Sequence, residues 1–122
     1  EALKIDADYA DAHNNLGVLL KKLGQLDEAI ESYEKAIAIN PVEADTYNNL
    51  GLTLKHAGRV DESEKSYRKA ISIDKDYTLA IAGLGDILIQ KGRHEEGLIN
   101  LRRANGSIFF DVKNGPSVKK ML

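Results

Sequence analysis

The chain has 122 residues, of which 43% are hydrophobic and 30% charged, with a formal net charge of −2. This balance is typical of one folded domain, and it provides no basic field to attract nucleic acid. The absence of cysteine excludes disulfides, thiolate nucleophiles and Cys-ligated metals, and it leaves the compartment open, with the cytoplasm favoured. No apolar run approaches the roughly 20 residues of a membrane span. Because the sequence starts without an initiator methionine or a leader, we expect it to be part of a longer protein.

A repeat of 34 residues organises the sequence. Residues 10–43 and 44–77 align without gaps and are identical at 17 positions, and residues 78–106 continue the register with eight matches to the second copy. Self-similarity at such a period is typical of stacked helical repeats. Residues 1–9 align with the end of the first copy, so we expect them to be the end of a preceding repeat.

Each copy predicts two helices. In the first copy, Gly24 ends the first helix, because glycine adopts the left-handed conformation of a helix C-cap, and Pro41 ends the second. The apolar side chains recur at the three- and four-residue spacing of amphipathic helices, at Leu16, Leu19, Leu20 and Leu23 and then at Ala29, Ile30, Tyr33, Ala36 and Ile37. One hairpin cannot bury its own apolar stripe, so we expect the hairpins to stack into a solenoid.

Small residues recur with the repeat. Gly17 and Ala36 in the first copy correspond to Gly51 and Ala70 in the second. A glycine inside a helix lowers its stability by about 1 kcal/mol. Its return at the same register therefore predicts that two helices approach closely there.

The repeated pattern resembles the tetratricopeptide repeat family. The matching residues of the first copy are Leu16, Gly17, Leu20, Gly24, Ala29, Tyr33, Ala36 and Pro41. The departures from the family pattern are Ser63 and Lys75 in the second copy, and Ile81, Gly97, Leu101 and Phe109 in the third. The resemblance implies an all-α fold, a right-handed α-solenoid of about three stacked antiparallel helix pairs. It also implies that the first helices line a concave groove, where family members usually hold a peptide or a partner segment.

The match fails after the third copy. We predict a helix stop at Asn105 and Gly106, and we treat residues 107–122 as a non-repeat C-terminal tail. Residues 107–112 are rich in residue types that favour strands, and Ser117 is suited to cap a short helix. The tail either covers the last hairpin or docks onto another copy or a neighbouring domain, and an unbroken third repeat is the remaining alternative.

Polar side chains line up along the first helices. Because residues three or four apart share a helix face, Asn15 lies in line with Lys22, and Asn49 lies in line with His56. The resemblance implies that these lines face the groove. The predicted partner-binding residues are Asn14, Asn15, Lys22, Asn48, Asn49, Lys55, His56 and Asp86.

The asparagines allow two interpretations. An amide carries two donors and an acceptor, so Asn15 and Asn49 can clasp the backbone of an extended peptide, as in the similar repeats of O-linked N-acetylglucosamine transferase. Alternatively, they bridge adjacent helices or reflect a common residue choice of the family. Gly83 occupies the corresponding position of the third copy, so the ladder stops after two rungs.

Other chemistries find little support in the sequence. The family's two-carboxylate clamp for chaperone C-termini is not expected, because its five positions match only once; they read Asn14, Val18, Asn49, Leu79 and Gly83. No two of the three histidines have the spacing of metal ligands, and no local signature of a catalytic nucleophile is present.

We therefore predict a protein-interaction scaffold that is not an enzyme and needs no cofactor or metal. It binds a protein or peptide in its concave groove, rather than nucleic acid or a membrane. Two alternatives stay open. One is the substrate-recruiting repeat region of a larger enzyme of the transferase or oxygenase type. The other is a structural array that forms homo-oligomers through exposed repeat ends or the tail.

Overall fold

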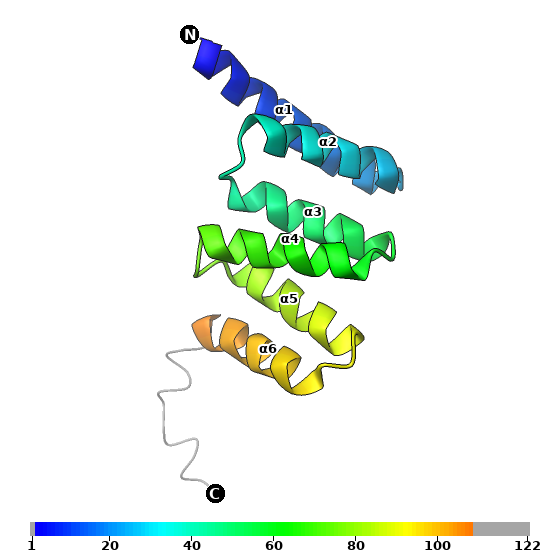
Figure 1. The fold of residues 1–122 in the computed structure, drawn as a ribbon, viewed down its shortest axis with the longest axis vertical. Coiled ribbons are helices and arrows are strands. Elements are labelled where there is room, and N and C mark those ends of the chain that lie inside the picture. Colours follow the sequence, from blue (N-terminus) through cyan, green and yellow to red (C-terminus); the bar gives the residue numbers. More distant parts are fainter. Residues whose placement is uncertain (1, 109–122) are drawn as a thin grey trace, which may run out of the picture.

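The computed structural model describes residues 2–108 and the side chains of residues 9–106. This part of the chain forms six α-helices and no strands; the helices are α1 (Ala2–Lys22), α2 (Leu26–Ile39), α3 (Ala44–His56), α4 (Val60–Ile73), α5 (Thr78–Gln90) and α6 (His94–Ile108). They follow one another in chain order along the long axis of the molecule (Figure 1). The predicted all-α solenoid is confirmed.

Glycine turns join the helices into three hairpins, α1 with α2, α3 with α4, and α5 with α6. Gly24, Gly58 and Gly92 stand 34 residues apart and have φ angles of +83°, +83° and +86°. This left-handed conformation is open to glycine without steric cost. The predicted helix end at Gly24 is confirmed, since α1 ends at Lys22.

The first helices of the hairpins form one layer and the second helices another. α3 packs against both α1 and α5, whereas α2, α4 and α6 pack far less against one another in the described part of the chain. The closer spacing within the first layer curves the stack toward α1, α3 and α5. These helices therefore form its inner, concave side.

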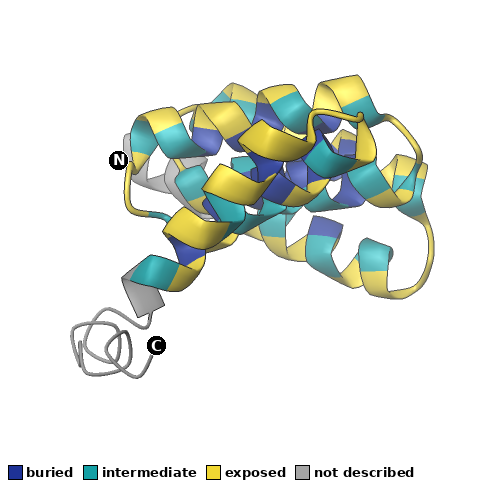
Figure 2. Ribbon diagram, turned by 90° about the horizontal axis from the view of Figure 1, so that it is seen from below, coloured by how far each residue is buried: buried dark blue, intermediate teal, exposed yellow. Residues whose placement is uncertain are grey.

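Tyrosines of the second helices occupy the centre of the core. Tyr33 and Tyr67 are almost fully buried. A Cβ atom added to Gly17 would lie 2.6 Å from the Tyr33 ring, and one added to Gly51 would lie 3.0 Å from the Tyr67 ring. The prediction that these glycines mark close helix contacts is confirmed, and Figure 2 shows the buried residues gathered where the helices meet.

Tyr67 also reaches the next hairpin. A Cβ added to Gly83 of α5 would lie 2.5 Å from two atoms of the Tyr67 ring. Gly83, which in the sequence only interrupts the asparagine ladder, thus provides the space in which the ring joins α4 to α5.

Ser63 shows how the structure accommodates a departure from the family pattern. The side chain is fully buried at the position of Ala29 in the first hairpin. Its Oγ donates a hydrogen bond of 2.6 Å to the backbone oxygen of Gly51. The hydroxyl is thereby satisfied inside the core, as a buried polar group requires.

The helix boundaries differ from the sequence prediction at the two ends. α1 is continuous from Ala2 to Lys22, so no turn separates residues 2–9 from the rest of the helix, and their origin in a preceding repeat stays a prediction. The predicted helix stop at Asn105 and Gly106 is wrong, because α6 continues to Ile108. Glycine lowers helix stability without forbidding the helical conformation.

The predicted strand-like segment and short helix of the tail fall largely on residues 109–122, which lie outside the described residues. No helix among the described residues has the length and apolarity needed to cross a membrane.

The contact between Tyr67 and Gly83 predicts the effect of added side-chain volume. We expect Gly83→Ala to lower the free energy of unfolding by about 1–2 kcal/mol, because overpacking costs more than the helix propensity gained. The measurement is urea unfolding followed by far-ultraviolet circular dichroism.

Gly106→Ala is the matched control, because nothing lies within 4 Å of a Cβ added to Gly106 in α6. It should raise the free energy of unfolding by about 0.5–1 kcal/mol. Equal effects of the two substitutions would show that the ring does not confine α5.

Candidate partner-binding groove

The inner layer is hollowed between α3 and α5. The hollow has a volume of about 370 Å³. Its lining residues are Asn48, Asn49, Leu52, Lys55, Tyr67, Leu79, Ala82, Gly83 and Asp86. All except Tyr67 come from α3 and α5, so the hollow is a groove between two neighbouring helices of the concave side.

Four of the eight predicted binding residues meet at this hollow, namely Asn48, Asn49, Lys55 and Asp86. The Nζ atom of Lys55 lies 3.8 Å from Oδ2 of Asp86 and links the two helices. Both side chains stay partly exposed, and an exposed ion pair of this kind contributes little to stability. Lys55 and Asp86 can therefore exchange their mutual contact for charged groups of a ligand.

The asparagine ladder includes an internal contact. Nδ2 of Asn49 donates a hydrogen bond of 3.2 Å to Oδ1 of Asn14, which joins α3 to α1. This bond corresponds to the second interpretation of the asparagines, a bridge between helices. It uses one of the two donors of the Asn49 amide, so the same side chain still has groups for a ligand. Asn15 is exposed on α1, whereas Asn48 is buried.

Lys22 and His56 do not line the hollow. Lys22 is the exposed last residue of α1. His56 is the last residue of α3, and its pKa is lowered by partial burial and by the positive charges of Lys21 and Lys55. The imidazole is therefore mainly neutral at pH 7.

Sequence reasoning missed two contributors to the hollow. Tyr67 was expected only in the core, but it also forms part of the wall. Burial and the negative charge of Asp86 raise its pKa to about 12, so the phenol stays protonated. Leu79 is exposed at the rim. The available signal was its place in the same helical line as Gly83 and Asp86.

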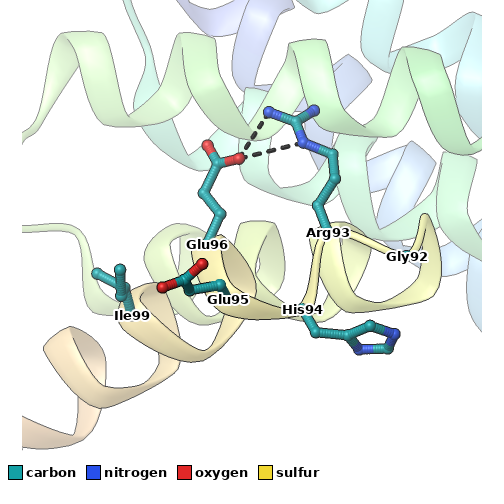
Figure 3. A pocket seen from close by; sticks show the side chains of 6 residues that line it. All are labelled: Gly92, Arg93, His94, Glu95, Glu96 and Ile99. Carbon is teal, nitrogen blue, oxygen red and sulfur yellow. Dashed lines mark hydrogen bonds and ion pairs between the residues drawn. The ribbon is translucent and has the colours of Figure 1, made fainter.

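A larger hollow, of about 550 Å³, lies at the turn before α6 and has the features of a repeat turn. Figure 3 shows the Arg93 guanidinium paired with the Glu96 carboxylate, and His94 pointing away from this pair. A similar hollow of about 360 Å³ is lined by residues 24–28, which stand 68 positions earlier than residues 92–96. Its recurrence at the same repeat position indicates that the turn geometry creates it.

The densest cluster of charges joins the second and third hairpins. The largely buried Glu64 carboxylate accepts hydrogen bonds from Lys91 at 2.7 Å, Arg68 at 2.9 Å and Arg93 at 3.2 Å. The bond from Lys91 is the main cause that holds the pKa of Glu64 below its ordinary value. These charges satisfy one another. In the part of the chain that the structure describes, no three His, Asp or Glu residues are grouped as a metal site.

A family model for the tetratricopeptide repeat matches residues 10–41 and 44–77. The chain belongs to the tetratricopeptide repeat family. Its third hairpin, α5 with α6, lies outside the matched residues and has the same helix–turn–helix form.

Plant proteins share a short segment with this tetratricopeptide chain. Over 42 residues it is 45% identical to the "Probable UDP-N-acetylglucosamine--peptide N-acetylglucosaminyltransferase SPINDLY" of Hordeum vulgare. The same identity is found with the protein of that description from Oryza sativa subsp. japonica. The match covers 34% of this chain and spans only 4% of either plant protein.

Solved structures resemble most of the chain. A crystal structure of MamA has a TM-score of 0.80 at 29% identity and covers 88% of this chain, which spans 63% of that one. The second tetratricopeptide domain of Spaghetti (RPAP3), bound to the HSP90 peptide SRMEEVD, has a TM-score of 0.81 at 25% identity. That likeness covers 85% of this chain and 95% of the other.

The charge cluster predicts a pH-dependent stability. Glu64→Gln should lower the free energy of unfolding by about 1–2 kcal/mol at pH 7, because it weakens hydrogen bonds to three cations. Since folding lowers the pKa of Glu64, its contribution is present above the ordinary carboxyl pKa and is lost as the pH falls through the folded-state pKa. The difference between wild type and variant should therefore vanish between about pH 5 and pH 3 in urea unfolding.

Glu62→Gln is the control for this prediction. Glu62 pairs with Arg59 in the same turn, and both side chains are exposed, so its replacement should have a much smaller effect. Equal losses in the two variants would contradict a special role of Glu64 between the hairpins.

Proposed function

We propose that the chain is a protein-interaction scaffold that binds a peptide or a partner segment in the groove between α3 and α5. The observation that carries the proposal is the composition of one hollow on the concave side. It combines an amide at Asn49, the opposite charges of Lys55 and Asp86, and apolar surface at Leu52 and Leu79. The likeness to the peptide-bound domain of Spaghetti (RPAP3) supports this use of the fold.

The groove residues are held before the ligand arrives. The bond from Asn49 to Asn14 fixes the orientation of the Asn49 amide, whose remaining donor and carbonyl oxygen can pair with a peptide backbone. Lys55 and Asp86 offer one charge of each sign. A ligand therefore meets a preformed surface, and little ordering entropy opposes its binding.

The charge pattern favours a ligand unlike the acidic peptide in the Spaghetti (RPAP3) complex. The positions that would form a two-carboxylate clamp hold Val18, Leu79 and Gly83 where cations are needed. We expect a segment that lays an apolar side chain beside Leu79 and places groups of opposite charge at Lys55 and Asp86. A terminal carboxylate is not required for this contact.

A second function rests on the plant similarity. The match to the SPINDLY proteins covers 42 residues of repeat sequence, so the groove can equally serve as the substrate-recruiting region of a larger enzyme. In either case the described helices contribute binding rather than catalysis. A catalytic domain encoded with this chain would decide for the second function.

The test is a selection of peptides from a random displayed library on the folded chain, followed by titration of the selected peptide. We expect Asn49→Ala and Asp86→Ala each to weaken binding about 3- to 10-fold, the effect of one lost hydrogen bond or charge contact. Circular dichroism should show unchanged helicity.

Glu31→Ala is the matched control, because Glu31 is exposed on α2 and lies outside the groove. Its affinity should equal that of the wild type. A peptide that is insensitive to both groove substitutions and loses binding with Glu31→Ala would overturn the proposal.

A further inference from the structure

The first helix exposes an apolar face that is covered in the other hairpins. Leu16, Leu19 and Leu23 of α1 are 43%, 53% and 63% exposed. At the positions of Leu16 and Leu19, the second hairpin has Leu50 and Thr53, which are 7% and 0% exposed. The second helix of the preceding hairpin covers these positions in α3 and α5, so the face of α1 is suited to receive such a helix.

The last helix exposes the complementary face at the other end of the stack (Figure 1). Leu98 of α6 is 49% exposed, whereas Ile30, at the same repeat position in α2, is 3% exposed. Ile30 packs in one cluster with Leu50 and Leu54 of the following hairpin. α6 therefore exposes the kind of side chain that α2 buries against its successor.

Matched pairs of side chains join the hairpins inside the chain. At one pair of repeat positions, Ile30 packs in the cluster that Ala57 contacts. At the next junction the same two positions hold Glu64 and Lys91, which form an ion pair of 2.7 Å. Both members change together, from apolar to oppositely charged, so the chemistry at this pair of positions is matched at each junction.

The two free ends satisfy the same rule with each other. The position of Ile30 and Glu64 is held by Leu98 in α6, and the position of Ala57 and Lys91 is held by Leu23 in α1. The exposed end of α6 is thus apolar where the exposed end of α1 is apolar.

A second pair of positions gives the same result. Tyr33 hydrogen-bonds the side chain of Thr53 across the first junction. The corresponding residues at the ends are Leu101 in α6 and Leu19 in α1. A polar-tipped pair inside the chain is replaced by an apolar pair at the ends, again with both members changed.

We propose that α6 of one molecule packs onto α1 of a second copy of the chain, in the register by which α2 packs onto α3 and α4 onto α5. Leu98 then meets Leu23 of the neighbouring copy. The contact joins two different surfaces, so it is heterologous and repeats from copy to copy. It continues the solenoid and leaves the groove between α3 and α5 open, and it is independent of the proposed peptide binding.

The test measures the average mass of the 122-residue chain by sedimentation velocity from micromolar to millimolar concentration. The mass of the wild type should rise with concentration. Leu23→Lys and Leu98→Glu should each reduce the association constant at least about tenfold, because each buries one unpaired charge. Both positions are exposed in the single molecule, so circular dichroism should show intact helices.

A charge-pair rescue makes the test specific for this register. The double variant Leu23→Lys with Leu98→Glu recreates the pairing of Glu64 with Lys91, and its association should recover. An equimolar mixture of the two single variants should also associate, because each contact in an alternating chain is then matched. Glu31→Lys, on the outer layer, is the control and should associate like the wild type.

Three results would overturn the proposal. One is a concentration-independent monomer mass of the wild type, as expected where residues 109–122 or another protein covers α6. Another is association that Leu23→Lys abolishes and Leu98→Glu leaves unchanged, which is the behaviour of a symmetric contact between two α1 helices. The last is failure of both the double variant and the mixture to associate.

Discussion

A buried tyrosine ring sets the spacing between neighbouring hairpins. Tyr67 fills the space that a Cβ atom would need on Gly51 of its own hairpin and on Gly83 of the next. Buried aromatic rings remove a large apolar area from water, and the missing side chains of the glycines let the ring touch both inner helices. The distance from α3 to α5, and hence the groove between them, depends on this contact.

Geometry and junction chemistry are carried by different positions of the repeat. The tyrosine and glycine positions set the path of the backbone, and they hold Tyr33 with Gly17 in one hairpin and Tyr67 with Gly51 in the next. The position of Ile30, in contrast, becomes a glutamate in the second hairpin and pairs there with a lysine. Such variable pairs can distinguish one junction from another without altering the fold, since a mismatched charge at a junction is costly.

Sequence periodicity predicted most of the fold because its determinants are local or strictly repeated. The glycine turn after α1 and the contact between Gly17 and Tyr33 needed only the 34-residue register and the conformational preferences of the residues. The helix stop at Asn105 and Gly106 was wrong, because a turn signal weighed alone omits the packing that extends α6.

The candidate groove was predictable only in part. A line of residues four apart identifies a helix face, but it does not say which side chain of the neighbouring helix comes within reach. The bond from Asn49 to Asn14 and the contact of Tyr67 with Gly83 both depend on how one hairpin sits on the next. Neighbouring hairpins also decide that Leu50 is covered while Leu16, its counterpart in α1, is half exposed.

Native-state hydrogen exchange of Tyr67→Ala, in increasing denaturant, tests most directly whether this ring couples the hairpins. In a solenoid, each hairpin is stabilised by its neighbours. Without the ring, the amides of α5 and α6 should lose protection at denaturant concentrations where those of α1 and α2 remain protected. Simultaneous loss of protection in all these helices, as in a single cooperative unit, would contradict the account.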